Sequence, residues 1–392
     1  MHRPASDLSG MPADAIGAVT HPDPYPFYAA LRAKGPLLFD EGLQLWLATR
    51  ADAVGAVLAD PRCRVRPAAE PVPRGMAGQP AGEVFGQLVR MTDGPRQQAG
   101  KRALEQALRT VDATALQAQA QALAQRLAQH HRLDVPAQLG AWAFELPLHA
   151  VAQALGLAQG PGLITRVRDF VSGLAPSATA AQQQAAGGAA TALRQQIHAL
   201  LQQSHPPTPL LQSLRDAGWP DADMRAANLV GLLSQTYEAT AGLLGNGIVA
   251  LLRQPALRER LRDEPAFARA FVREVSRHDP SVQNTRRFVA EATTLCGAAL
   301  KPGDTVLVLL ASAARDPTLH DAPDEFRPGR AEAWQPGFGA GPHACPGQRL
   351  AHAIAAGALG ALVRHAALAP TGGVSWRYRP SVNARIPEFH PA

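Results

Sequence analysis

The chain of 392 residues has few cysteines, few aromatic side chains and no tract of one charge. Its three cysteines, Cys63, Cys296 and Cys345, are too few and too scattered for a disulfide framework, which indicates a reducing compartment. Lysine and arginine number 38 against 32 acidic residues, and the excess is spread along the chain. A nucleic-acid-binding protein needs a concentrated basic stripe, so we expect no nucleic acid as a partner. The modest excess suits an acidic protein partner better.

Long apolar runs are missing as well. Residues 1–24 are polar and interrupted by proline, and they hold no stretch near the roughly 18 apolar residues that a membrane helix needs. We therefore expect no signal peptide, no membrane partner and a soluble protein of the cytoplasm. Hydrophobic residues make up 46% of the chain, which is enough for a substantial core, and abundant alanine and leucine favour helices.

Hydrophobic periodicity predicts a mainly helical fold with a small β-rich portion. The predicted helices cover 24–34, 51–58, 97–108, 114–127, 160–174, 190–203, 222–252, 265–277 and the chain from the last cysteine to residue 365. Short strands are predicted over 36–39 and 43–47, within 289–308 and in the tail. Two segments lack a clear period: 62–89 is expected to be a long functional loop, and 177–188, rich in alanine, glutamine and glycine, is expected to be mobile.

The most informative segment surrounds the last cysteine. Residues 338–347 have the sequence Phe-Gly-Ala-Gly-Pro-His-Ala-Cys-Pro-Gly and lead into an apolar helix. Glycines allow the backbone to approach a large flat cofactor. The positive N-terminal end of the helix points at the Cys345 sulfur, which favours the thiolate. A thiolate is one of the few axial ligands that proteins use for haem iron.

This segment resembles the haem-ligand loop of the cytochrome P-450 superfamily, Phe-Gly-x-Gly-x-His/Arg-x-Cys-x-Gly followed by x-x-Leu-Ala. Every fixed position is filled. The resemblance implies a soluble, bacterial-type member with the cytochrome P-450 fold, in which Cys345 binds the iron of haem b (iron protoporphyrin IX). It further implies one domain over 1–392, with a β-rich lobe from parts of 36–60, 289–310 and 370–392. The implied haem-binding residues of the loop are Phe338, Gly339, Gly341, His343, Cys345 and Gly347.

A second part of the resemblance lies upstream of this loop. Glu274 and Arg277 are three residues apart on one predicted helix and can pair, although alone such pairs are usually solvated. Arg330 follows within Phe-Arg-Pro-Gly-Arg. This order resembles the Glu-x-x-Arg helix of the family and the later arginine of its meander. It implies a buried structural triad, in which arginine offers a planar fork to the carboxylate.

The resemblance also implies contacts to the haem propionates. By spacing, Arg287 matches the propionate-binding arginine, with Arg286 as the neighbouring alternative, and His343 fits the other propionate. The predicted helix over 97–108, which would hold the remaining propionate contacts, matches the family pattern less closely. Gln97 replaces its histidine and Lys101 replaces its arginine, and a lysine can still act as a point charge.

The longest predicted helix holds the clearest departure from the family. The family pattern Ala/Gly-Gly-x-Asp/Glu-Thr-Thr covers the oxygen-binding face of the haem. Glu238 matches the acid, but Ala239 stands where the usual threonine belongs, and Thr240 lies about 100° further round the helix. The resemblance assigns proton delivery to that threonine. Here protons would come from ordered water, from Thr236 or Gln235, or from a substrate hydroxyl or carboxyl. The alternative is that Ala239 only packs and that the activity is weak.

Substrate contacts are implied at three further positions. Arg64 and Arg66 lie in the segment that matches the substrate-facing loop of the family, and Leu232 lies on the long helix. Both arginines are expected to be solvated. The alternative is that one of them clamps a substrate carboxylate by a bidentate contact.

Together these features imply a haem-thiolate monooxygenase that activates dioxygen to oxidise an apolar small organic molecule, such as a terpenoid. Electrons would come from NAD(P)H through a separate ferredoxin reductase and ferredoxin. The ferredoxin would dock on the cysteine side, where Arg349 and Lys101 attract an acidic partner. One alternative is a haem-thiolate oxidase that performs desaturation, multi-step oxidation, coupling or peroxide-driven chemistry. A more distant alternative is a haem-binding ligand sensor without turnover.

Overall fold

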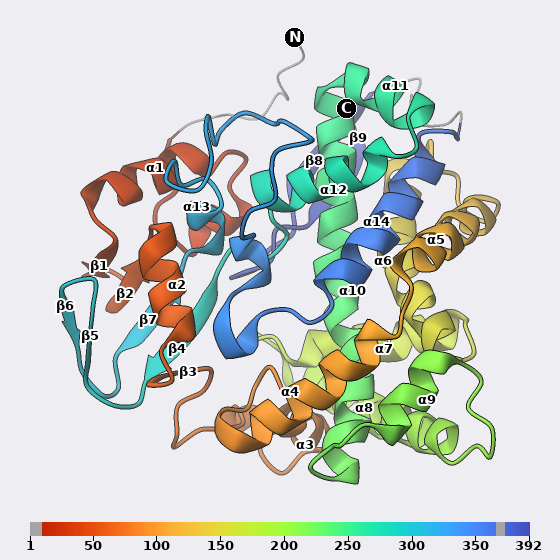
Figure 1. The fold of residues 1–392 in the computed structure, drawn as a ribbon, viewed down its shortest axis with the longest axis horizontal. Coiled ribbons are helices and arrows are strands. Elements are labelled where there is room, and N and C mark those ends of the chain that lie inside the picture. The colour runs from red at the N-terminus through yellow and green to blue at the C-terminus, as the bar shows by residue number, and fades with distance from the viewer. Residues whose placement is uncertain (1–9, 366–372) are drawn as a thin grey trace.

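The computed structural model describes residues 10–365 and 373–392. Figure 1 shows a large helical body on one side and a small β-rich lobe on the other, which confirms the predicted fold class. Among the described residues, no helix combines the length and the apolar character that crossing a bilayer requires.

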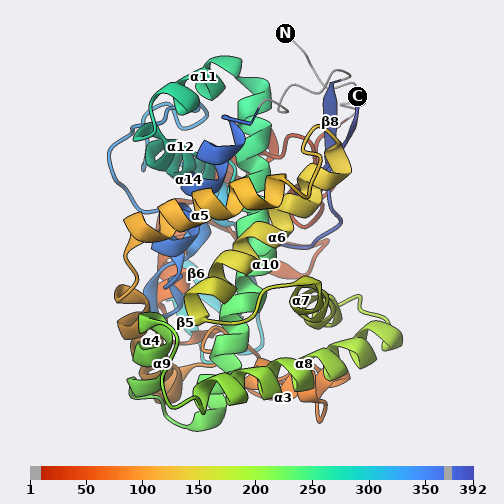
Figure 2. The same ribbon diagram turned by 90° about the vertical axis from the view of Figure 1, so that its right-hand side faces the viewer.

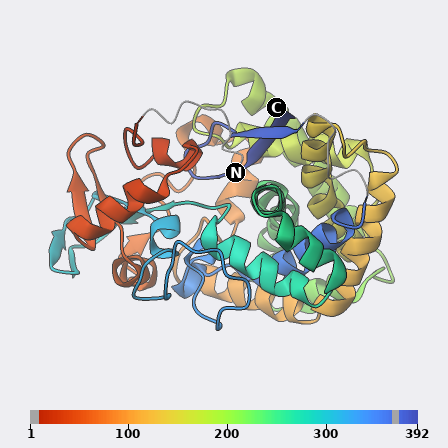
Figure 3. The same cartoon turned by 90° about the horizontal axis from the view of Figure 1, so that it is seen from above.

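The helical body is built around α10 (Ala222–Arg253), which begins where the Asp221 side chain accepts a hydrogen bond from the N–H of Met224 at 2.8 Å. This helix runs vertically through the body in Figures 1 and 2, and Figure 3 therefore views it end-on. Most of α10 is buried, as expected of a helix that is apolar on most of its faces. The other described helices are α1 (Tyr25–Lys34), α2 (Ala51–Ala59), α3 (Pro80–Gln87), α4 (Gly94–Arg109), α5 (Ala113–Ala128), α6 (Pro136–Leu155), α7 (Pro161–Gly173), α8 (Ala180–Leu201), α9 (Pro209–Asp216), α11 (Pro255–Asp263), α12 (Phe267–His278), α13 (Leu310–Ala313) and α14 (Gln348–Leu362).

The β-rich lobe contains a five-stranded sheet with the order β1-β2-β7-β4-β3. Its pairs are antiparallel except for β2 and β7, which are parallel. The sheet joins residues 37–64 to residues 285–308, and Val54 and Val57 of α2 lie in one buried cluster with Val306 and Val308 of β7. The strands are β1 (Leu37–Asp40), β2 (Leu45–Ala48), β3 (Cys63–Arg64), β4 (Thr285–Val289), β5 (Thr293–Leu295), β6 (Ala298–Leu300), β7 (Thr305–Val308), β8 (Val374–Tyr378) and β9 (Pro387–Pro391). Within residues 10–365 and 373–392 there are also four short 3-10 turns: η1 (Gly17–Thr20), η2 (Arg74–Met76), η3 (Pro336–Phe338) and η4 (Gly341–His343).

The C-terminal hairpin lies elsewhere than expected. Strands β8 and β9 pair with each other and not with the five-stranded sheet, and β9 packs against α6 and α10. Phe389 is buried in the helical core, which explains why this hairpin belongs to the helical body. Residues 370–372 of the expected lobe lie outside the described residues.

Helices α6, α9 and α11 were not predicted, and two further segments differ from the sequence-based expectation. Residues 177–188, expected to be mobile, are helical from residue 180 onward, because Thr179 and Gln182 form a reciprocal capping box that begins α8. The small residues allow close packing on α7: a Cβ atom at Gly173 would lie 2.3 Å from the Cβ of Ala186. Residues 62–89, expected to be a loop throughout, also contain β3, η2 and α3.

Candidate functional site

The loop between η4 and α14 presents Cys345. The backbone N–H of Cys345 donates to the carbonyl oxygen of Phe338 at 2.8 Å, and this hydrogen bond closes the loop. Burial raises the pKa of the Cys345 thiol, and this outweighs the backbone N–H groups of Gly347 and Gln348 and the charge of Lys101, which lower that pKa. The start of α14 thus favours the thiolate as expected but does not produce it alone. Coordination of a metal cation would shift the balance, because binding requires the deprotonated sulfur.

Glycine is required where this loop meets α2. Gly341 has a φ of 61°, and a Cβ atom there would lie 2.8 Å from the carbonyl oxygen of Leu58. Gly339, with a φ of 73°, accepts a hydrogen bond at its carbonyl from Trp334 Nε1 at 2.9 Å. The ring of Phe338 packs edge-on against His352, with ring centroids 5.1 Å apart. These contacts hold the loop in one conformation.

Helix α4 supports the loop from the other side. Gln97 Nε2 donates to the carbonyl oxygen of Pro342 at 3.0 Å, and Lys101 Nζ donates to that of Ala344. Both side chains are buried, and desolvation lowers the pKa of Lys101 although Glu105 lies 3.7 Å away. The two residues expected near the propionates therefore also position the cysteine loop.

Two buried nitrogen atoms near this loop have no hydrogen-bond partner among the described residues: Arg287 Nε and His343 Nδ1. Arg287 is buried on β4, whereas Arg286 on the opposite face of the strand is exposed. His343 holds its other nitrogen, Nε2, 3.1 Å from Asp93 Oδ1. Buried polar atoms are rarely left unpaired, so a carboxylate-bearing ligand fits here. The strand register thus favours Arg287 over the alternative Arg286.

One face of α10 is less buried than the rest of the helix. Leu232, Gln235, Thr236 and Ala239 share this face at helical spacing, whereas Thr240 is only 3% exposed on another face. The structure therefore places Ala239 beside Thr236 and Gln235, and it buries Thr240, which lies about 100° from Ala239 round the helix. Gln235 Nε2 donates to the carbonyl oxygen of Gly231 at 3.0 Å.

Glu238 lies next to this face in a mixed electrostatic environment. Burial raises the pKa of its carboxyl, while the positive charges of Arg379 and Arg90 lower it. Arg379 is itself 3.3 Å from Glu388 and lies over the ring of Phe144. A carboxyl with a raised pKa retains a proton closer to neutral pH, which suits proton transfer.

The structure brings Glu274, Arg277 and Arg330 together. Arg277 Nη2 and Nε donate to the two oxygens of Glu274 at 2.7 and 2.9 Å, and Arg330 Nε lies 3.3 Å from Oε1 of Glu274. The N–H of Arg327 donates to the same oxygen at 2.7 Å. Glu274 and Arg277 are almost fully buried, so this cluster ties α12 to the chain that leads into the cysteine loop.

Arg64 and Arg66 each lie near an acidic side chain of the protein. Arg66 Nη2 lies 3.2 Å from Glu70 Oε1 and also donates to the backbone carbonyl of Glu70. Arg64 lies 3.8 Å from Glu291, with 39% of its side chain exposed. The geometry therefore gives no support to a carboxylate clamp at either position. Sequence reasoning missed Arg90, whose charge reaches Glu238.

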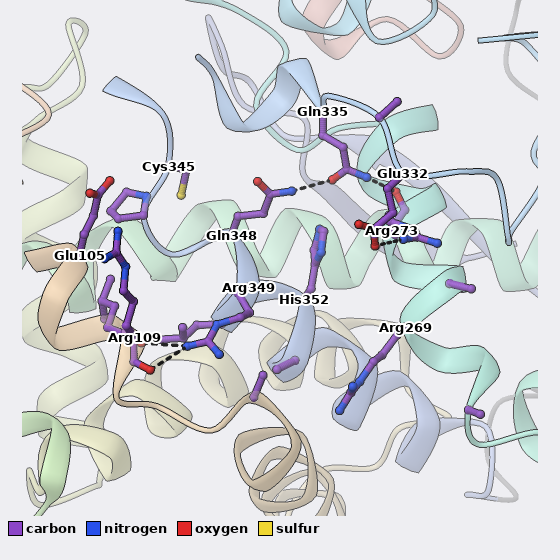
Figure 4. Close-up of a pocket in the computed structure, with 18 residues that line it drawn as sticks. Glu105, Arg109, Arg269, Arg273, Glu332, Gln335, Cys345, Gln348, Arg349 and His352 are labelled. Carbon is purple, nitrogen blue, oxygen red and sulfur yellow. Dashed lines mark hydrogen bonds and ion pairs between the residues drawn. The ribbon is translucent and has the colours of Figure 1, made fainter. Parts of the chain in front are cut away.

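A basic pocket of about 840 Å³ lies beside Cys345 (Figure 4). Arg349 in its wall donates to the carbonyl oxygens of Leu108 and Val111 at 3.1 and 2.8 Å, and so ties α14 to the end of α4. Lys101, expected with Arg349 on the docking face, is instead buried and donates to the carbonyl oxygen of Ala344. The charged residues that line the pocket are Glu105, Arg109, Arg269, Arg273, Glu332 and Arg349.

Comparison with known proteins gives consistent matches. The family model described as cytochrome P-450 matches residues 221–376. The cytochrome P-450 monooxygenase PikC of Streptomyces venezuelae is 31% identical over 365 residues, covering 89% of this chain and 85% of that protein. The biotin biosynthesis cytochrome P-450 of Bacillus subtilis is 25% identical over 390 residues, covering 94% of this chain and 95% of that protein.

Solved structures with a similar fold include CalO2, with a TM-score of 0.81 and 25% identity over 97% of this chain and 99% of that one. They also include P450BioI, solved in complex with an acyl carrier protein that bears hexadec-9Z-enoic acid. Its TM-score is 0.78, with 23% identity over 93% of this chain and 97% of that one.

Proposed function

Since this chain belongs to the cytochrome P-450 family and is a monooxygenase of that family, we propose that it oxidises an apolar small organic molecule, with terpenoids among the candidates. Its electrons come from NAD(P)H through a separate ferredoxin reductase and ferredoxin. The observation that carries the proposal is the position of Cys345, between a loop fixed by α2 and α4 on one side and an open basic pocket on the other.

Membership of the family implies a haem cofactor, and the residues around Cys345 fit one. The Cys345 sulfur would bind the iron, and Arg287 and His343 would offer their buried unpaired nitrogens to the propionates. Gln97 and Lys101 hold the loop by the carbonyl oxygens of Pro342 and Ala344. The bound haem supplies the dioxygen and one-electron chemistry.

We assign proton delivery at this site to residues of α10. Burial raises the pKa of the Glu238 carboxyl, so this carboxyl takes up a proton more readily than an exposed glutamate does, and it lies one residue from Ala239. Ala239 offers no hydroxyl, so the nearest polar groups on that face are Thr236 and Gln235. A polar group of the substrate or an ordered water molecule completes the path, because proton transfer needs partners within hydrogen-bond reach.

Ala239→Thr is expected to change how efficiently electrons are used. An added hydroxyl on this face supplies a second proton path, so the variant should release several-fold less hydrogen peroxide per NAD(P)H oxidised, at equal haem content. Thr236→Val is the matched control, because it removes a hydroxyl from the same face, and it should increase the release of peroxide. If neither variant changes this ratio, α10 side chains do not carry the protons.

Turnover with isotopically labelled dioxygen distinguishes hydroxylation from the alternative reactions that the presence of Ala239 allows. Hydroxylation places one labelled oxygen atom in the product, and multi-step oxidation can place more. Desaturation and ring coupling place none, and peroxide-driven turnover proceeds without NAD(P)H.

Charge reversal in the basic pocket is expected to slow electron delivery. Arg109 is exposed at the rim, where an acidic ferredoxin would meet it, so Arg109→Glu should slow reduction by ferredoxin about tenfold at low salt. The same rate should fall as salt is raised, because exposed charges are screened. Arg74→Glu on η2, where the side chain is 92% exposed, is the control and should leave the rate unchanged. A rate that does not depend on salt would rule out this docking mode.

A further inference from the structure

Arg90 lies in the short connection between α3 and α4, on a firmly held backbone. The N–H of the preceding residue, Val89, donates to Asn228 Oδ1 on α10 at 3.0 Å. The side chain of Asn228 donates in turn to the carbonyl oxygen of Gln87 at 2.9 Å. The N–H of Met91 closes a turn onto Leu88 at 2.8 Å. The backbone that carries Arg90 is therefore fixed on α10.

The guanidinium of Arg90 is both accessible and desolvated. Arg90 is an exposed residue, yet burial among surrounding protein lowers its pKa to about 10, and only the charge of Glu238 opposes this effect. The residues just before Arg90 pack against α10, because a Cβ atom at Gly231 would lie 2.8 Å from Leu88 Cδ2. Arg90 therefore lies beside the part of α10 that carries Glu238, next to the less buried face that holds Ala239.

Arg90 also differs from the buried arginines Arg277 and Arg385 in having no direct partner among the described residues. Arg277 pairs with Glu274 at 2.7 Å, and Arg385 pairs with Asp279 at 2.8 Å. No hydrogen bond or ion pair joins Arg90 to any residue in the part of the chain that the structure describes. A desolvated, unpaired charge is costly, and a ligand that brings the opposite charge removes that cost.

We propose that Arg90 binds a carboxylate of the substrate, so that the substrates of this enzyme are apolar organic acids. The planar guanidinium can hold both oxygens of a carboxylate at once, which fixes the direction of the attached skeleton. The apolar remainder then lies along the face of α10 formed by Leu232, Thr236 and Ala239, on which the proposed chemistry takes place. This inference rests on the proposed function and names the substrate class for the same site.

The test compares acids with their methyl esters on the haem-loaded enzyme. The probes are hexadecanoic acid and abietic acid, each with its ester, and dissociation constants come from the optical shift of the haem and from calorimetry. The wild-type enzyme should bind at least one acid about 10- to 100-fold more tightly than its ester, as a charge-assisted pair provides. Arg90→Gln should remove this preference and leave ester binding unchanged, and Arg90→Lys should restore part of it.

Arg64→Gln is the matched control, because this exposed arginine is the rival clamp, and it should keep the preference of the wild type. Equal affinity for acid and ester in the wild-type enzyme overturns the proposal. So does a loss of haem in Arg90→Gln with the acid preference retained, which would assign Arg90 to a haem propionate. Labelled oxygen in the product of a neutral substrate, without any acid preference, overturns this inference alone. If no product of any substrate gains labelled oxygen, the proposed function fails instead.

Discussion

Cys345→Ser is expected to abolish the red-shifted Soret band of the reduced carbon monoxide complex and to reduce turnover to the level of free haem. The serine hydroxyl is not ionised near neutral pH, so it cannot replace the thiolate as an electron-rich axial ligand. The N–H groups of Gly347 and Gln348 remain in place, and the loop keeps its hydrogen bond from residue 345 to Phe338. The change therefore isolates the sulfur from the shape of the loop.

The control for this experiment is Cys296→Ser. Cys296 is exposed and lies between β5 and β6, outside the residues of the proposed haem site. Its replacement should leave both the spectrum and the turnover unchanged. A thiolate spectrum that survives in Cys345→Ser would contradict the assignment of the iron ligand.

Glu274→Ala is expected to lower the free energy of unfolding by about 3–5 kcal/mol, because it leaves the charge of Arg277 buried without its partner. Arg277 and Glu274 are only 2% and 3% exposed, so water cannot replace the carboxylate. The N–H of Arg327 loses its acceptor as well. Chemical denaturation of the haem-loaded enzyme measures the loss, and haem content after purification should fall with it.

A more exposed ion pair between α12 and the chain before η3 provides the comparison. Arg273 Nη1 lies 2.6 Å from Glu332, whose side chain is 88% exposed. Glu332→Ala should therefore cost less than about 1 kcal/mol although the distance is as short. Equal losses in the two variants would show that burial does not set the contribution of Glu274.

The cysteine loop could be predicted from sequence because its chemistry is local. Glycines, cysteine and helix start lie within a few residues of one another, and each has a physical role at that position. The choice between Arg286 and Arg287 could not be made from sequence. Alternation along a strand places the two side chains on opposite faces but does not say which face is buried. That choice depends on the pairing of β4 with β7, where Arg287 lies opposite Val306.

Other features depended on tertiary contacts that the sequence does not display. Helix α6 was missed, and it contains Pro147, which local preference disfavours inside a helix. The composition of α8 shows little apolar period, and its start depends on a cap. The sequence does not distinguish Arg90 from the other arginines, because its position depends on the hydrogen bond from the Val89 N–H to Asn228 on α10.

The support that α4 gives to the cysteine loop has a consequence for how the protein is made. Gln97 and its acceptor Pro342 are 245 positions apart, so the ribosome completes α4 long before the loop exists. N-terminal segments emerge first during synthesis, and for most of that time the iron site lacks its ligand. Acquisition of the prosthetic group is therefore one of the last events in biogenesis, and nascent chains that end before Cys345 carry no thiolate ligand for it.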